Sequence, residues 1–183
     1  MEFAETAIDG CVIVKPQRHL DERGFFARVW CANEFREARL PEQIVQSSLS
    51  FNRKAGTLRG MHMQIPPSKE GKLVRCVRGA MVDVVVDLRG PLESDLRTVT
   101  IRLDDKNRLA IYVPPGCAHG FQTLEDDTDV LYMMTDFYQP HLSQGFRWND
   151  PAFNIDWPID NPIIHERDAG YPDFDKSAYS ANG

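Results

Sequence analysis

Short β-forming segments separated by tight turns fill the middle of the chain, and they constrain its fold more than any other feature. Each segment has the branched and aromatic content of a strand. The turns at Arg78-Gly79 and at residues 104–107 each predict a hairpin between the segments that flank them. Many short strands and few helices favour a mainly β chain, folded as an antiparallel sandwich or barrel. The segments cover residues 72–77, 81–88, 99–103, 109–113, 117–124 and 129–138.

The part of the chain before these segments contains two further strand candidates and one helix. Residues 8–15 and 44–51 have the β-branched content of strands. Residues 31–40 are the best helix candidate, with Asn33 as the capping residue and Pro41 directly after the end. We therefore expect a single short helix on the N-terminal side of the barrel.

The chain changes character after Gln139. The last segment is rich in proline, aspartate and tryptophan, and it carries too many aromatic residues for a disordered tail. We interpret it as an irregular arm that packs back over the barrel, across its mouth. The 183 residues then suit one domain, residues 1–183, with a core that needs no disulfide or metal to stabilise it.

Charge and apolar patterning exclude several classes of protein. The formal net charge is −6, so the surface as a whole is not suited to nucleic acid. No apolar run approaches the length of a membrane span, and the acidic N-terminus does not resemble a signal peptide. The cysteines, at positions 11, 31, 76 and 117, are scattered without a CxxC pair, as expected of reduced thiols in a cytoplasmic protein.

Residues 56–79 concentrate the side chains that could carry chemistry. His62 lies in an apolar run, between Arg59 and Lys72 in the sequence. A lone histidine on such a strand is usually a core residue. A histidine among inward-facing cations is costly to bury without an anionic ligand or a catalytic role. Lys72 and Arg75 are an odd number of residues apart, so they face opposite sides of a regular strand.

A metal centre is the main alternative for this histidine. His119 follows the turn at residues 114–116, in the position of the later histidine of metal-binding β-barrels. The first cluster, however, reads His62-Met63-Gln64 rather than His-x-His. Lys72 and Arg75 would also repel a divalent cation. We therefore expect no metal, and near a histidine base Tyr132 could instead supply a proton from the opposite face of a substrate.

Five motifs follow one another in a fixed order. They are Asp21-Glu22-Arg23-Gly24-Phe25-Phe26, Gly56-Thr57-Leu58-Arg59-Gly60-Met61-His62, Lys72-Leu73-Val74-Arg75, Val113-Pro114-Pro115-Gly116-Cys117-Ala118-His119-Gly120-Phe121 and Trp148-Asn149-Asp150-Pro151. Together they closely resemble the motifs of the dTDP-4-dehydrorhamnose 3,5-epimerase family, from about Ile8 to Pro172. The resemblance implies a cupin-type jelly-roll barrel, a homodimer that exchanges N-terminal strands, and neither a metal nor an organic cofactor.

The resemblance also implies a reaction and the roles of individual residues. The family inverts carbons that flank the 4-keto group of a nucleotide-linked 6-deoxysugar. His62 matches the base, and Asp168 matches the carboxylate that orients it. Tyr132 matches the acid on the other face, and Lys72 the cation that stabilises the enolate. The positions that match substrate contacts are Arg23 (in the neighbour's site), Phe26, Arg28, Gln46, Ser48, Arg59, His119, Ser143 and Arg167.

The chain departs from the family pattern at several of these contacts. The family usually has glutamate at positions 28 and 143, Gln-x-Asn at 46–48 and Ser-Glu-Lys-Asp at 165–168, whereas this chain has Arg28, Ser143, Gln46-Ser47-Ser48 and His165-Glu166-Arg167-Asp168. The nucleotide (dTDP, CDP or GDP), the sugar, and inversion at C3, C5 or both therefore stay open. The alternatives are a 3,4-ketoisomerase, a metal-dependent cupin and a non-catalytic sugar-binding cupin.

Overall fold

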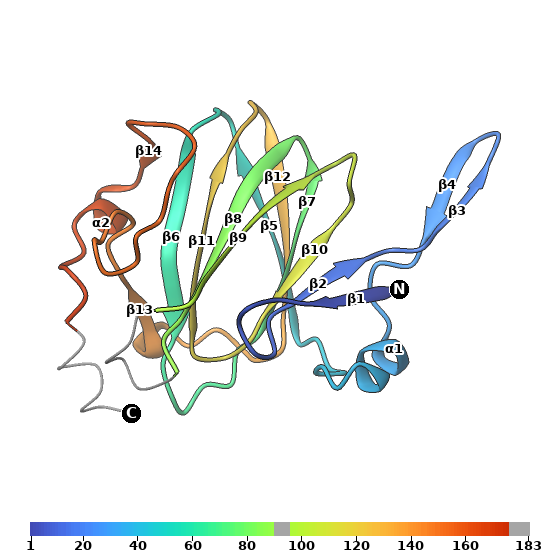
Figure 1. Ribbon diagram of the computed structural model, residues 1–183, viewed down its shortest axis with the longest axis horizontal. Coiled ribbons are helices and arrows are strands. Elements are labelled where there is room, and N and C mark those ends of the chain that lie inside the picture. Colours follow the sequence, from blue (N-terminus) through green and yellow to red (C-terminus); the bar gives the residue numbers. More distant parts are fainter. Residues whose placement is uncertain (90–95, 176–183) are drawn as a thin grey trace.

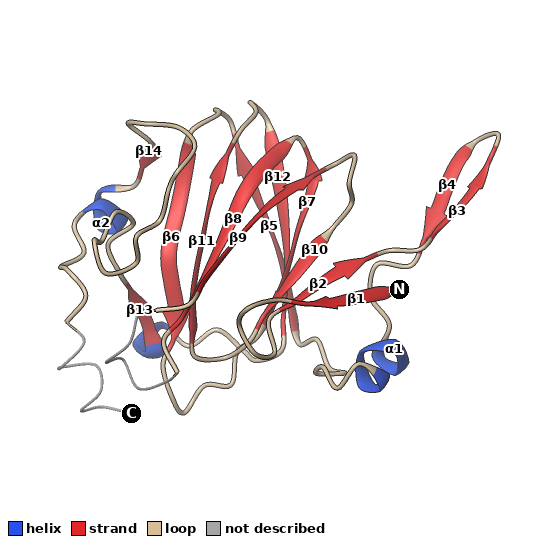
Figure 2. Cartoon of the chain, viewed as in Figure 1, coloured by secondary structure: helices blue, strands red, loops and turns tan. Residues whose placement is uncertain are grey.

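Two antiparallel β-sheets face each other in the computed structural model, which describes residues 1–89 and 96–175 (Figure 1). A two-stranded hairpin projects from one end of this sandwich, and short helices lie at its margins (Figure 2). The predicted mainly β jelly-roll fold is confirmed. The expected single domain includes residues 90–95 and 176–183, which lie outside the described part of the chain.

The first sheet contains six strands, two of them from the N-terminus. Only part of the expected segment 8–15 is a strand, because the chain turns at Gly10 with a φ of 72° while Ile8 is buried. The first strand, residues 2–5, was not predicted, and it pairs with the second across that turn. The order is β1 (Glu2–Glu5), β2 (Val12–Lys15), β10 (Ala110–Val113), β7 (Lys72–Arg78), β12 (Thr128–Met134) and β5 (Gln46–Asn52).

The second sheet carries a strand edge that the C-terminal arm covers. Two short strands of the arm pair with opposite ends of the same long strand, which leaves that edge closed to other chains. The order is β13 (Ser143–Gly145), β6 (Thr57–Gln64), β11 (Cys117–Thr123), β8 (Ala80–Asp87) and β9 (Thr98–Asp104), and β14 (Ile163–Ile164) pairs with β6 in parallel.

Both hairpins predicted in the middle of the chain are wrong. β7 lies in the first sheet between β10 and β12, whereas β8 lies in the second sheet. β9 and β10 are likewise in different sheets. The turn at Gly79, with a φ of 78°, therefore carries the chain from one sheet to the other. A tight turn reverses the direction of the chain, but it does not decide which strand the next segment pairs with. That depends on which of the two sheets the segment joins so that its apolar face packs against the other sheet.

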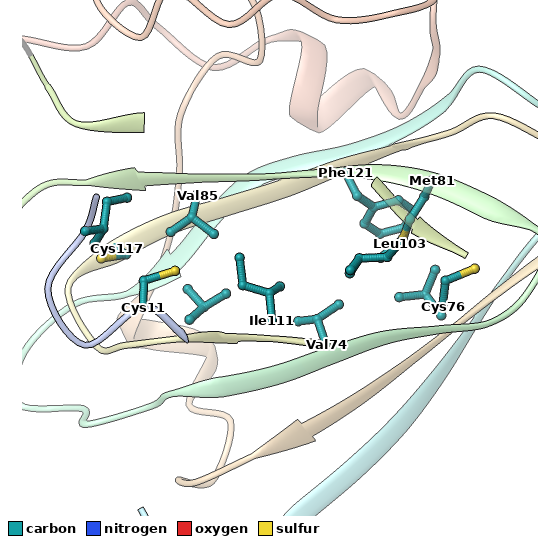
Figure 3. Packing of buried hydrophobic residues seen from close by; sticks show 12 residues of the cluster. Cys11, Val74, Cys76, Met81, Val85, Leu103, Ile111, Cys117 and Phe121 are labelled. Atoms are coloured by element: carbon teal, nitrogen blue, oxygen red, sulfur yellow. The ribbon is translucent and has the colours of Figure 1, made fainter. Parts of the chain in front are cut away.

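The main core lies between the inner faces of the two sheets (Figure 3). Alternate residues of each strand point inward, as the period of a strand requires. Burial raises the pKa of Cys11 to about 11 and the pKa of Cys76 to about 12, so these free thiols stay protonated and act as small apolar side chains. The inward residues include Val74, Cys76, Ile111 and Val130 from the first sheet, and Met81, Val85, Leu103 and Phe121 from the second.

The C-terminal arm packs against the outer face of the second sheet. Phe146, Phe153 and Trp157 form an apolar cluster with Leu58 and Val84 on that face. The expectation that the arm crosses the mouth of the barrel is therefore wrong for most of its length. The exception is the segment that contains α2 (Glu166–Ala169). This segment returns to β6 and lines the cavity described below.

The N-terminal helix is shorter than predicted, since α1 spans Ala32–Glu37. Cys31 rather than Asn33 is the residue before its first turn, and no side chain caps it. The helix ends before Pro41 because Arg39 has a φ of 59° and the Leu40 N–H reaches back to the Phe35 carbonyl oxygen at 2.8 Å. A 3-10 turn, η1 (Pro140–Leu142), completes the helical elements. None of the helices in the described ranges has the length and apolarity of a membrane span.

The hairpin of β3 (Arg18–Asp21) and β4 (Gly24–Ala27) extends away from the sandwich (Figure 1). Its tip is the turn that the sequence indicates around Arg23. Two of its large apolar side chains face solvent, with Leu20 79% and Phe26 75% exposed. Exposed apolar side chains grouped on a projecting element are typical of a surface that binds another chain.

Candidate active site

A cavity of about 670 Å³ lies between the two sheets where α2 meets the strand edge. Its walls come from β6 and β11 of the second sheet, β5, β7 and β12 of the first sheet, and residues 163–168 of the arm. It brings together residues that are up to 118 positions apart in the sequence, from Ser50 to Asp168. The predicted site residues that line it are Arg59, His62, Lys72, His119, Tyr132, Arg167 and Asp168.

His62 and Asp168 form a hydrogen-bonded pair across β6 and α2. His62 Nε2 lies 2.9 Å from Asp168 Oδ1, and the Asp168 side chain is 4% exposed. Burial alone would raise the pKa of Asp168, but hydrogen bonds from His62 and Arg167 outweigh it and hold this pKa below its usual value. An ionised Asp168 accepts the Nε2 proton of His62 and leaves Nδ1 as the basic nitrogen of the ring.

Arg167 is bound to this pair. Its Nε donates to Asp168 Oδ1 at 3.0 Å, and its Nη2 lies 3.5 Å from His62 Nε2. The short helix α2 places Arg167 and Asp168 together, and the His165 side chain caps it by accepting the Arg167 N–H at 3.1 Å. The Arg167 guanidinium therefore lines the cavity and helps to fix the carboxylate.

His119 forms a second histidine–carboxylate pair deeper in the cavity. Its Nε2 lies 2.8 Å from Oδ2 of Asp83, whose side chain is completely buried. Within the described residues, the other oxygen of Asp83 has no hydrogen-bond partner. Burial raises the pKa of Asp83, and the charge of His119 opposes that rise. The sequence prediction missed Asp83, although a carboxylate inside the apolar segment 81–88 was a signal for it.

Tyr132 projects from β12 on the first sheet, across the cavity from His62 on the second sheet. Burial raises the pKa of Tyr132 well above its usual range, and the nearby charge of Asp83 adds to this effect. The ring of His119 lies edge-on to the Tyr132 ring, with a centroid separation of 6.3 Å. The phenol therefore keeps its proton and remains a potential donor on the face opposite His62.

Lys72 and Arg75 face opposite sides of β7, as their spacing predicts. Lys72 lines the cavity, and its Nζ lies 3.1 Å from Glu70 Oε1. The Arg75 guanidinium instead donates to the Arg108 carbonyl oxygen near the outer face of the first sheet. Burial lowers the pKa of Arg75 to about 10, and the charge of Arg108 adds to that effect.

The other six predicted contacts do not line this cavity within one chain. Arg23 pairs with Asp21 at 2.6 Å on the projecting hairpin, which also carries the exposed Phe26. Arg28 pairs with Glu34 at 3.1 Å, close to α1. Gln46 and Ser48 lie on β5, the strand next to that of Tyr132. Ser143 lines a different cavity, of about 840 Å³, against the outer face of the second sheet.

A metal does not fit the donor set of the cavity. Across residues 1–89 and 96–175, no three or more histidine, cysteine, aspartate and glutamate side chains come close enough to hold an ion together. His62 and His119 each direct Nε2 at a carboxylate. Arg59 and Lys72 add positive charge to the same walls, which favours an anionic ligand over a cation.

The fold is that of a cupin-type barrel, and the histidine–carboxylate pairs and cations of its cavity make a candidate acid–base site for an anionic ligand. The family model described as dTDP-4-dehydrorhamnose 3,5-epimerase matches residues 5–176. The enzyme of that name from Methanothermobacter thermautotrophicus is 39% identical over 172 residues, which cover 92% of each chain. The chain belongs to the dTDP-4-dehydrorhamnose 3,5-epimerase family, and it is an isomerase of the epimerase type.

Two solved structures show the same fold. The dTDP-4-dehydrorhamnose 3,5-epimerase of Bacillus anthracis, with TDP and PPi bound, has a TM-score of 0.89 and 32% identity, over 94% of this chain and 99% of that one. The epimerase of Legionella pneumophila, in complex with dTDP-4-keto-L-rhamnose, has a TM-score of 0.84 and 33% identity, over 93% and 90%.

Proposed function

We propose that this chain inverts C3 and C5 of a dTDP-linked 4-keto-6-deoxyhexose by acid–base proton transfer. The observation that carries the proposal is the His62–Asp168 pair, which faces Tyr132 across a cavity with Lys72 in its wall. A base and an acid on opposite sides of one ring carbon are the arrangement that inversion requires. The dTDP-linked sugar bound to the Legionella pneumophila relative supports the choice of nucleotide.

The reaction proceeds through an enolate. His62 Nδ1 takes the proton from the carbon next to the keto group. The electron pair of that C–H bond forms a carbon–carbon double bond to the keto carbon, and the π pair of the carbonyl moves onto its oxygen. The ammonium of Lys72 stabilises the resulting negative charge. Tyr132 then donates its proton to the opposite face of the carbon, and the keto group re-forms. Proton exchange with water restores His62 and Tyr132. His62 then takes the proton from the second carbon in the same way, and a water molecule returns a proton to the opposite face of that carbon.

The remaining basic side chains of the cavity suit the diphosphate of such a substrate. Arg59 lines the cavity, and its Nε donates to Asn52 Oδ1 at 2.9 Å, which orients the guanidinium. Arg167 and His119 lie in the same walls. Guanidinium groups bind phosphate oxygens through paired, charge-assisted hydrogen bonds. These three residues are therefore the proposed contacts to the diphosphate or the sugar.

We also propose that the chain acts as a homodimer, in which each projecting hairpin binds the other copy. Leu20 and Phe26 on the hairpin, and Leu49 and Phe51 on β5, expose large apolar surfaces that a second copy could cover. Such a dimer would bring Arg23 close to the neighbour's cavity. A single domain over residues 1–183, in the reducing cytoplasm that suits four free thiols, completes the proposal.

The test is incubation with 4-keto-6-deoxy nucleotide sugars in deuterated water, using dTDP-, CDP- and GDP-linked substrates. We expect deuterium at C3 and C5 of the dTDP-linked sugar. Absence of deuterium at both carbons with every substrate would reject the proposal. Binding without exchange would indicate a non-catalytic sugar-binding protein, and a displaced carbonyl in the product would indicate a 3,4-ketoisomerase.

A further inference from the structure

Glu70 is a buried carboxylate that neither the sequence motifs nor the proposed reaction uses. It lies in the loop between β6 and β7, and its side chain is 4% exposed. Oε1 lies 3.1 Å from Lys72 Nζ, and Oε2 accepts a hydrogen bond from Gln64 Nε2 at 2.8 Å. Both carboxylate oxygens are therefore occupied, one by the cation at the cavity wall and one by an amide behind it.

The surrounding chain fixes this carboxylate. Gln64 Oε1 accepts the Gln139 N–H at 2.8 Å, so the amide that holds Glu70 is itself held by the segment after β12. The Gly71 N–H donates to Thr135 Oγ1 at 2.7 Å, and the Glu70 N–H donates to Ser68 Oγ at 3.2 Å. The loop thus has hydrogen bonds on both sides of Glu70, and the carboxylate has one orientation.

An ordered partner matters for lysine more than for most side chains. A lysine side chain has several rotatable bonds, and fixing it in one position costs rotamer entropy. The Lys72 side chain is 16% exposed, so its ammonium is largely removed from water and has the Glu70 carboxylate as its ion-pair partner. The ammonium has three N–H donors, so an ion pair with one oxygen leaves donors for a ligand.

We propose that Glu70 is a positioning residue of the reaction, which holds the charged Lys72 ammonium at the cavity wall where the negative charge of the enolate develops. The inference rests on the proposed function for the role of Lys72. Gln64 is part of the same arrangement, because its amide nitrogen donates a hydrogen bond to Oε2 of Glu70, the oxygen that does not pair with Lys72. Asp83 also lies near enough for Lys72 to influence its charge, but the ion pair of Lys72 is with Glu70.

A double-mutant cycle tests whether Glu70 acts through Lys72. Glu70→Gln keeps the size of the side chain and removes its charge. We expect it to lower kcat for deuterium exchange about 10- to 100-fold, with KM changed less than about 2-fold, as for a misplaced catalytic group. In a Lys72→Met background the same substitution should change the residual rate by less than about 2-fold. Equal losses in both backgrounds would overturn the proposal.

Two further variants separate positioning from folding. Glu2→Gln removes the same charge from the exposed Lys15–Glu2 ion pair, whose atoms lie 3.0 Å apart, and should leave kcat unchanged. Glu70→Asp keeps the charge but withdraws the carboxylate, and it should lower kcat while thermal unfolding shows a folded protein. A Glu70→Asp protein with the kcat of the wild type would contradict the inference.

A measurement that needs no turnover distinguishes failure of this inference from failure of the proposed function. The rate at which an acylating reagent modifies Lys72 is followed by mass spectrometry, with Lys54, which pairs with Asp126, as the internal reference. We expect Lys72 to be modified several-fold faster, relative to Lys54, in Glu70→Gln than in the wild type. An unchanged ratio would show that Glu70 does not control the ammonium, whether or not the wild type exchanges deuterium.

Discussion

His62 and His119 lie directly opposite each other on the adjacent strands β6 and β11, yet each Nε2 contacts a different carboxylate. Asp168 reaches His62 from α2 at the end of the arm, whereas Asp83 reaches His119 from β8 in the same sheet. The two histidines therefore differ in surroundings despite their shared register. His62 has a partner at the cavity margin, and His119 has one that is fully buried.

Removing the imidazole of His62 tests its role as the base. We expect His62→Ala to lower deuterium exchange at both carbons by at least about 10²- to 10⁴-fold, the usual contribution of a general base. Exchange is followed by NMR of the sugar, and thermal unfolding verifies the fold. A variant that exchanges at the rate of the wild type would show that another group is the base.

Removing the hydroxyl of Tyr132 tests proton donation from the opposite face. Tyr132→Phe keeps the ring that packs beside Phe121 at a centroid separation of 6.4 Å. Since His62 remains, we expect exchange to continue at one carbon and inversion to fall at the other by about 10²-fold or more. Chromatographic separation of the epimers measures the inversion. Equal inversion at both carbons would exclude Tyr132 as the donor.

Replacing the carboxylate of Asp168 has an effect on stability that depends on pH. Burial by itself would raise the pKa of Asp168. The hydrogen bonds from His62 and Arg167 have the larger, opposite effect, so the pKa in the folded protein lies below the ordinary value of 3.8. Such a group contributes stability above its unfolded pKa and loses it as the pH falls through the folded pKa. Relative to Asp168→Asn, we expect the wild-type free energy of unfolding to decline between about pH 5 and about pH 3.

The measurement for Asp168 is urea unfolding at each pH and a fixed protein concentration. A difference between the two proteins that is constant over this range would contradict the assignment of the lowered pKa. At neutral pH, Asp168→Asn should also lower deuterium exchange by about 10²-fold or more, because the imidazole loses the partner that sets its orientation and tautomer.

A charged substitution on the hairpin tests the proposed dimer. Phe26→Asp places a carboxylate where a 75% exposed phenyl ring would be covered by the second copy. Burying an unpaired charge is costly, so we expect light scattering to show a shift from dimer to monomer at micromolar concentration. Glu22→Gln, at the tip of the same hairpin, should leave the mass unchanged. A wild-type protein that is monomeric would reject the dimer itself.

Local patterns predicted most of the strands, and the family resemblance supplied most of the candidate site residues, but neither predicted the partner of each strand. Alternation along β7 predicted that Lys72 and Arg75 face opposite sides, and in the structure Lys72 is the one that lines the cavity. The turns at Gly79 and at residues 104–107 suggested hairpins that the structure does not contain. A turn predicts that the chain reverses direction, but it does not predict which sheet the next strand joins. The predicted helix, residues 31–40, was longer than α1 because nothing in the sequence signalled the left-handed backbone conformation at Arg39.

The sequence by itself determined a mainly β barrel, and the resemblance of its motifs to the family indicated the candidate residues of a histidine-based acid–base site. The tertiary structure brought Asp168, which the resemblance matched to His62, within hydrogen-bond distance of that histidine, and it added Asp83 and Glu70 to the surroundings of the site. The physical reason is that a buried charge must find its partner in space. His62 and Asp168 are 106 positions apart, and a separation of that length carries no local signal of contact.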